Sequence, residues 1–179
     1  VVHVSTARGL GPVQWGKAEG LVVYAETCPQ YITMTDEVLQ RLGPLAKIGP
    51  PLRTEKDRMA LWEGMQDETI DVVASDHAPK AKKIDEPFFE AAYGSPQAET
   101  MLTVTHDEGV NTGRITLCRL VQLLSENPAK IFGLYPQKGI LQKGSDADMV
   151  LFDPNRVCTI RHKNQHSGAS YTLYEGREC

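Results

Sequence analysis

The sequence predicts an α/β fold built on a parallel β-sheet that helices cover on both faces. Three short, nearly continuous apolar segments, at residues 1–5, 21–27 and 70–74, are typical of buried parallel strands. Helix-forming segments separate them along the chain. From residue 138 onward the pattern changes, because short strand candidates follow one another with no helical segment between them.

The helices are predicted from their start and stop signals. Pro12 suits the first turn of a short helix running to about Glu19, because its fixed φ fits that position. Thr54 is a good N-cap, with Asp57 at the capping-box position, for a helix over residues 54–66. Further helical patterns cover residues 98–108 and 117–124.

The remaining elements are shorter. "ENPAKIFGL" predicts a helix with Asn127 as N-cap, Pro128 at its first position and Gly133 as its stop. Short strands are predicted at residues 149–152, 157–160 and 171–174. The chain opens without methionine inside a predicted strand, so we expect it to be the C-terminal portion of a longer protein.

Composition argues against nucleic acid and membranes as partners. At 179 residues, with 41% hydrophobic and 23% charged side chains, the chain has the make-up of about one globular domain. A formal net charge of −4 and a pI near 5.7 give no attraction to polyanions. Apolar runs fall far short of the ~20 residues of a membrane span, and the first residues do not resemble a secretory signal. We expect a cytoplasmic protein.

The cysteines predict neither a zinc knuckle nor a disulfide framework. Cys28, Cys118, Cys158 and Cys179 are scattered, with no C-x-x-C spacing. Free thiols in a reducing compartment are therefore expected. Cys28 follows the second strand, and we expect it to be a buried, inert thiol rather than a nucleophile.

Polar residues close the predicted strands. His3 lies near the end of the first strand, and Asp76 follows the third in "TIDVVASDHAPK". Functional side chains gather at the C-terminal ends of parallel strands, and histidine with aspartate suits a divalent metal, Zn²⁺ above all. Such a metal activates water, and a carboxylate can relay its proton. A histidine in an apolar strand is more often a core residue, however, so the pattern alone leaves both interpretations open.

Six segments in order resemble the dihydropyrimidinase/hydantoinase group of the cyclic amidohydrolases. They are "VHVS", "VYAETCPQY", "KIGPPLR", "VVASDHAP", "NPAKIFGLYPQKG" and "GSDADMVLFDP". The resemblance runs from Val1 to about Gly176, and "ETCPQY" favours the hydantoinase branch over allantoinases and dihydroorotases.

The resemblance implies a (β/α)8 barrel with a small β-sandwich made from both chain ends. Residues 1–137 would then be the C-terminal part of the barrel, with its last three strands. Residues 138–179 would be part of the composite sandwich. The family also implies a homo-oligomer, a tetramer in its relatives, and a cytoplasmic location.

The resemblance further implies two divalent metal ions, with zinc the expected element, bridged by a carboxylated lysine and a hydroxide. His3 matches one histidine ligand, and Asp76 matches the aspartate ligand that also serves as the catalytic acid and base. The other ligands, an H-x-H pair, the lysine and one further histidine, belong to strands that this chain does not contain. We expect the isolated chain to be inactive and to hold the metal pair incompletely or not at all.

Substrate contacts in the family come largely from backbone groups, which fall here at Gly49 and at about Pro96. His77 is expected to hydrogen-bond in support of the site without touching metal, and Arg53 to tie its loop to the barrel. The segment after "SDHAPK" looks short for the family.

The implied function is metal-dependent hydrolysis of a small cyclic amide, opening a hydantoin or dihydropyrimidine ring. One alternative is a non-catalytic dihydropyrimidinase-related assembly protein. Another is an allantoinase- or dihydroorotase-type enzyme. A scaffold has no chemical need for His3 and Asp76, which favours the enzyme. The exact amide, its stereochemistry and the metal are left open.

Overall fold

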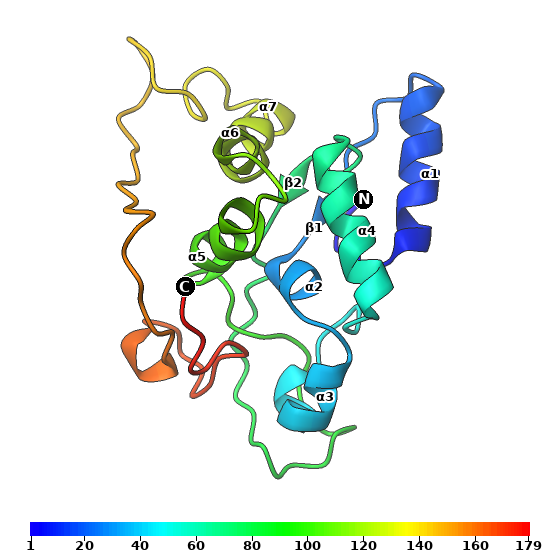
Figure 1. Cartoon of the computed structure of the whole chain (residues 1–179), viewed down its shortest axis with the longest axis vertical. Coiled ribbons are helices and arrows are strands. Elements are labelled where there is room, and N and C mark those ends of the chain that lie inside the picture. Colours follow the sequence, from blue (N-terminus) through cyan, green and yellow to red (C-terminus); the bar gives the residue numbers. More distant parts are fainter.

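The computed structural model describes residues 1–179 as short strands surrounded by helices (Figure 1). The strands are β1 (Glu26–Thr27) and β2 (Val72–Val73). The α-helices are α1 (Ala7–Ala18), α2 (Pro29–Thr33), α3 (Glu37–Leu42), α4 (Glu55–Gln66), α5 (Met101–His106), α6 (Leu117–Val121) and α7 (Asn127–Ile131). None of these helices combines the length and the apolar character that crossing a membrane requires.

The two strands pair in parallel, with Glu26 opposite Val72 and Thr27 opposite Val73. The predicted strand at residues 1–5 runs beside β1 without forming a regular ladder. Two backbone hydrogen bonds join it to β1, since Val4 N donates to Glu26 O at 2.8 Å and Glu26 N donates to Val1 O at 2.9 Å. The ladder is broken because the backbone of His3 has φ of 56°, which no extended strand tolerates. The other two predicted strands are also shorter than expected, although both lie where the sequence placed them.

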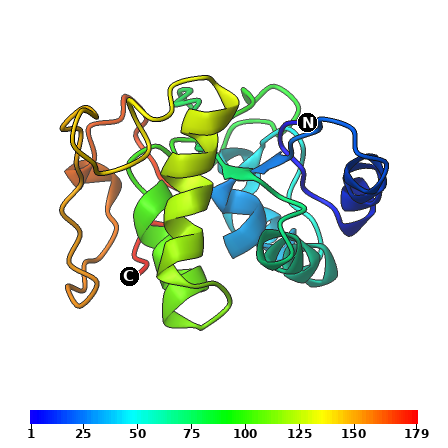
Figure 2. The same ribbon diagram turned by 90° about the horizontal axis from the view of Figure 1, so that it is seen from above.

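Helices flank both sides of these strands. α1 and α4 lie on one side and α5, α6 and α7 on the other, and the view from above shows the same separation (Figures 1 and 2). One hydrophobic core joins the layers. Its largest fully buried side chains include Trp62, Leu61, Ile32, Ile70 and Leu123. The predicted α/β class with helices on both sides is therefore observed, with less strand than the apolar runs indicated.

Capping explains where α1 and α4 begin. The Thr54 hydroxyl accepts from Asp57 N, as the capping box predicted. Asp57 Oδ1 also accepts from Ala7 N at 2.9 Å and so joins the starts of both helices. The prediction that Pro12 sits in the first turn is wrong, because Thr6 caps α1 and the helix begins at Ala7. Pro12 is tolerated inside α1 on its exposed side, where water can bond the carbonyl that proline leaves free.

The predicted helix at residues 117–124 extends further. A π-helical turn at Gln122–Glu126 connects α6 to α7, so Asn127 is inside a helical run and is not its N-cap. The Asn127 side chain instead donates to Asp71 O at 2.9 Å, which fastens α7 next to β2. Gly133, with φ of 70°, ends the run as predicted.

The C-terminal part from residue 138 contains no regular strand. Residues 149–152, predicted to be a strand, are unpaired and mostly exposed. Residues 171–174 are buried against the core without strand pairing, so that strand prediction is also wrong. Residues 157–160 do pair, through an antiparallel bridge between Thr159 and Glu178. Figure 1 shows this part as a long, extended connection beside α5 and α6.

Candidate metal centre

His3, Cys28 and Asp76 meet where the three strand segments end. His3 Nε2 lies 3.5 Å from Asp76 Oδ1. One ligand atom from each of the three residues lies within 4.8 Å of the others. Hydrogen bonds from Thr27 link the three segments, since its Oγ1 donates to Val4 O at 2.7 Å and its carbonyl accepts from Ala74 N at 3.0 Å. The structure thus brings His3 and Asp76 together, although they are far apart in the sequence.

Both candidate ligands have a left-handed backbone. The φ angles are 56° at His3 and 46° at Asp76, and Glu68 is the one other non-glycine residue with positive φ. Such residues are uncommon, and backbone strain of this kind gathers at functional sites. At both positions the backbone leaves the extended strand conformation, and the imidazole of His3 lies next to the carboxylate of Asp76.

The donor set fits a divalent metal ion. Zn²⁺ binds histidine nitrogen and carboxylate oxygen at about 2.0–2.2 Å, which places two tetrahedral ligand atoms roughly 3.4 Å apart. The 3.5 Å between His3 Nε2 and Asp76 Oδ1 matches that spacing. The same distance would also suit a direct ion pair if His3 were protonated. The residues present therefore fit the metal that the sequence predicted.

Gln30 is a member of this site that the sequence analysis missed. It is fully buried, and its Nε2 donates to Asp76 Oδ2 at 3.3 Å. Its Oε1 has no partner, and a buried amide oxygen without a hydrogen bond costs about 1–3 kcal/mol. The one sequence signal was a polar residue within the otherwise apolar stretch that follows Cys28.

Electrostatics separate Cys28 from the other two groups. Burial raises the pKa of the Cys28 thiol well above its usual range, and the carboxylates of Asp76 and Glu26 act in the same direction. A thiol binds metal only as the thiolate. Burial also raises the pKa of Glu26, against the opposing effect of His3. These effects favour His3 and Asp76 as ligands and agree with the inert thiol expected at position 28.

His77 holds a loop and does not join the cluster. Its Nδ1 accepts from Gln97 N at 3.2 Å and from Ala98 N at 3.1 Å. Ala78 N also donates to Ser95 O at 2.9 Å. The end of β2 is thereby tied to the loop that carries Pro96, which is the hydrogen-bonding role expected of His77.

The predicted substrate-contact residues lie on two loops that are fastened to each other. Gly49 precedes Pro50 through a cis peptide bond and faces Tyr93. Gly94, two residues before the buried Pro96, donates its N–H to Lys47 O at 3.2 Å. Neither Gly49 nor Pro96 belongs to the cluster of His3, Cys28 and Asp76, so their contact with substrate stays a prediction.

Two buried lysines reinforce this junction, and the sequence analysis did not identify them. Lys47 Nζ donates to Phe89 O at 2.9 Å and to Ala91 O at 2.7 Å. Lys82 Nζ donates to Lys47 O at 2.7 Å and to Leu45 O at 3.2 Å. Burial lowers the pKa of Lys82 to about 8, with Glu86 opposing and Lys47 adding to the effect. Lysines rarely lie in a protein interior, so the sequence alone gave no reason to expect either to be buried.

Arg53 was expected to tie its loop to the rest of the fold. Its carbonyl accepts from Asp36 N at 2.8 Å, but its buried Nε has no hydrogen-bond partner. The loop is therefore held through the Arg53 backbone.

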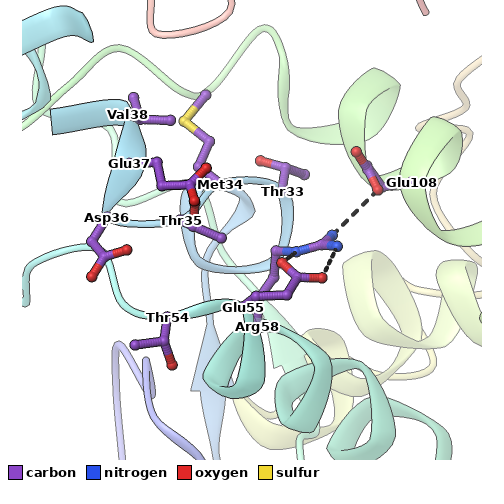
Figure 3. A pocket seen from close by; sticks show the side chains of 10 residues that line it. All are labelled: Thr33, Met34, Thr35, Asp36, Glu37, Val38, Thr54, Glu55, Arg58 and Glu108. Atoms are coloured by element: carbon purple, nitrogen blue, oxygen red, sulfur yellow. Dashed lines mark hydrogen bonds and ion pairs between the residues drawn. The ribbon is translucent and has the colours of Figure 1, made fainter. Parts of the chain in front are cut away.

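A surface pocket of about 590 Å³ lies away from the cluster, at the start of α4 (Figure 3). Arg58 points toward Glu55 and Glu108, with contacts of 2.6 Å and 3.5 Å. Because two carboxylates already pair with this guanidinium, it has little positive charge left for an anionic ligand. The pocket contains neither His3 nor Asp76, so it is not the candidate site.

Comparison with known proteins identifies the family. The Amidohydrolase family matches residues 16–175. D-phenylhydantoinase of Escherichia coli O1:K1 is 38% identical over 185 residues, covering all of this chain and 40% of that protein. The chain therefore spans about two fifths of the length of the relatives it matches.

Solved structures agree with the sequence matches. Dihydropyrimidinase from Brevibacillus agri NCHU1002 superposes with a TM-score of 0.94 at 34% identity, over 99% of this chain and 40% of that one. L-hydantoinase (dihydropyrimidinase) from Arthrobacter aurescens gives 0.92 at 36% identity, with the same coverage. The resemblance seen in the six sequence segments is confirmed, and the chain belongs to the amidohydrolase family.

Proposed function

We propose that this chain is the C-terminal part of a metal-dependent hydrolase that opens small cyclic amides of the hydantoin and dihydropyrimidine type. The observation that carries the proposal is the meeting of His3 Nε2 and Asp76 Oδ1 at 3.5 Å on two left-handed backbone positions. The names of the similar proteins supply the substrate class, since they are hydantoinases and a dihydropyrimidinase.

The same likeness supports a proposed architecture. Residues 1–137 would supply the last three strands of a (β/α)8 barrel, of which the segment at residues 1–5, β1 and β2 are the visible parts. Residues 138–179 would complete a β-sandwich with N-terminal residues of the whole protein. The exposed Val150 and Leu151 support this arrangement, because an apolar segment left exposed in this chain can be covered by residues from elsewhere in the whole protein.

The residues have distinct roles in the proposed reaction. His3 and Asp76 would supply two of the ligands to a pair of divalent metal ions, expected to be zinc, whose remaining ligands would come from other parts of the whole protein. The metal pair would supply a water that is deprotonated near neutral pH. Asp76 accepts the proton of the attacking water at a carboxylate oxygen and delivers it to the departing ring nitrogen.

The substrate is proposed to be held by backbone groups near Gly49 and Pro96. The hydrogen bonds of Lys47 and Lys82 support this role, because the two ammonium groups donate to main-chain carbonyls and hold the two loops together. Both D- and L-hydantoinases are among the similar structures, so the proposal is confined to the cyclic amide class.

The complete protein that contains this chain provides the test. We expect it to open hydantoin and dihydrouracil, to lose this activity on treatment with a chelator, and to regain it with Zn²⁺. Hydrolysis of allantoin or dihydroorotate alone would support the other enzyme class. Failure to hydrolyse any of the four compounds, even after Zn²⁺ is supplied, would favour the assembly protein.

A further inference from the structure

Two of the four cysteines lie directly opposite each other in the C-terminal part. Cys158 N donates to Cys179 O at 2.8 Å, and Cys179 N donates to Cys158 O at 3.0 Å. The antiparallel pairing continues inward with Thr159 opposite Glu178. Residues that exchange both backbone hydrogen bonds have Cα atoms about 5.5 Å apart. That spacing falls within the ~4.4–6.8 Å range of disulfides.

The two side chains also share a face. Opposite residues of an antiparallel pair project to the same side of the ladder. Cys158 and Cys179 accordingly line one pocket of about 310 Å³, together with His106 and Phe152. The Cβ atoms of such a pair are ~5.5 Å apart, and a disulfide needs ~3.5–4.5 Å, so closure requires an approach of roughly 1 Å.

The local structure permits that approach. Val157, on the open side of the ladder, is exposed and makes no backbone hydrogen bond. Cys158 is exposed, whereas Cys179 is half-buried, and burial raises the pKa of its thiol against the opposing effect of Arg177. Cys158 is therefore the thiol that a soluble oxidant reaches first.

We propose that Cys158 and Cys179 are a redox-active thiol pair that a small disulfide such as glutathione disulfide oxidises to an intramolecular disulfide. The Cys158 thiolate attacks one sulfur of glutathione disulfide, and one glutathione thiolate leaves. The Cys179 thiolate then attacks the Cys158 sulfur of the mixed disulfide and displaces the second glutathione. The two cysteine protons end on the two glutathione thiols, so two protein thiols are oxidised and one glutathione disulfide is reduced.

The cross-link would fasten a segment that packs on the rest of the fold. Between the two cysteines lie the buried Tyr171, Leu173 and Tyr174, which belong to the main core. Arg177 binds Asp107 at 2.7 Å and Glu108 at 3.0 Å, beside α5. Oxidation would close a loop between Cys158 and Cys179 and so lower the conformational entropy of the unfolded state. The folded, docked segment would thereby be stabilised.

The other cysteines provide internal controls. Cys28 is fully buried, and Cys118 is exposed at the start of α6. Neither is opposite another cysteine in a strand pair. Cys118 therefore reports the reactivity of an accessible thiol that has no partner.

The experiment treats the complete folded protein that contains this chain with glutathione disulfide, quenches free thiols and digests with trypsin. Cleavage after Arg156, Arg161 and Arg177 separates the two cysteines into peptide 157–161 and a peptide that begins at Glu178. We expect these two peptides to be joined in most molecules that run as monomers on a non-reducing gel, while Cys118 carries glutathione alone. The joined peptides should be at least tenfold less abundant when the oxidation is done in denaturant.

Single variants sharpen the result. Cys158→Ser and Cys179→Ser should each leave the remaining cysteine glutathionylated, whereas Cys118→Ser should leave the cross-link unchanged. The proposal is overturned if the wild-type protein accumulates glutathione on both Cys158 and Cys179. It is equally overturned if the peptides are joined only between two chains, or if the yield in denaturant equals that of the folded protein.

Discussion

The exchange of Asp76 for asparagine in the complete protein tests the proposed proton relay. Asparagine keeps the shape of aspartate and tolerates positive φ, so the backbone at φ of 46° is not strained further. Its side-chain oxygen can still accept from Gln30 Nε2. What Asp76→Asn removes is the negative charge and the ability to take a proton.

The expected loss of rate in Asp76→Asn is much larger than the expected loss of stability. Loss of a general acid and base costs ~10²–10⁴-fold in rate, which corresponds to about 3–5 kcal/mol of activation free energy. The contacts that Asp76 makes in the folded chain are weak, namely a 3.3 Å hydrogen bond and a 3.5 Å approach to His3. Contacts of this kind at a partly exposed carboxylate contribute under ~1 kcal/mol to the free energy of unfolding.

The assay measures kcat on hydantoin, bound metal and the thermal midpoint for Asp76→Asn and for a matched Asp153→Asn variant. Asp153 is an exposed carboxylate outside the cluster, so its variant should match the wild type in all three. We expect Asp76→Asn to lose at least a hundredfold in kcat with little change in thermal midpoint. Retention of most of the wild-type kcat, or a loss that merely follows unfolding, would refute the relay.

Three further predictions concern the other groups. In the complete protein His3→Ala should lower bound metal as well as rate, because an open site has no substitute imidazole. Full metal occupancy in this variant would contradict the assignment. The control His166→Ala, at a side chain that is 94% exposed, should change neither bound metal nor rate. Lys82 has a pKa of about 8 in the folded protein, below its unfolded value of about 10.5, so its buried charge destabilises the fold below pH 8 and this penalty is relieved as pH rises toward 10.5. The free energy of unfolding of the wild type relative to Lys82→Met should therefore rise by up to about 3 kcal/mol across that window, and denaturant titrations showing a pH-independent difference would argue against a buried charged lysine. The isolated chain should be inactive and self-associate, since Val22 and Leu151 are exposed beside unpaired backbone, whereas an active, monodisperse monomer by light scattering would overturn the incomplete-barrel interpretation.

Local signals in the sequence predicted several elements correctly. Thr54 and Asp57 form the capping interaction that marks the start of α4, and Gly133 ends the helical run after α7. Both depend on contacts within a few residues, which is why they could be predicted without the tertiary structure. The alternation of apolar runs with helical segments likewise predicted the class of fold.

Signals that depend on tertiary contacts were misjudged. Asparagine is a residue typical of N-caps, but the Asn127 side chain donates to the distant Asp71 O. The helical run continues through Asn127. Residues 149–152 have strand character without any partner in this chain, so they stay unpaired. Strand formation needs a second strand, and that information is not local.

The residues of the candidate site were likewise only partly predictable from the sequence. His3 and Asp76 were predicted from their positions at strand ends and from the family resemblance, and the structure places them together. Lys47 and Lys82 were missed because nothing in their neighbours signals that they are buried, and Gln30 was missed because the apolar residues around it do not identify its partner. Each makes its hydrogen bonds to residues far away in the sequence.

The most direct test of the central claim is the anomalous scattering of zinc in crystals of the complete protein. We predict a pair of zinc ions about 3.5–4 Å apart, with the imidazole of His3 and the carboxylate of Asp76 each about 2.0–2.2 Å from an ion of the pair. Zinc bound elsewhere, or a fully loaded protein in which neither His3 nor Asp76 contacts the ion, would contradict the account.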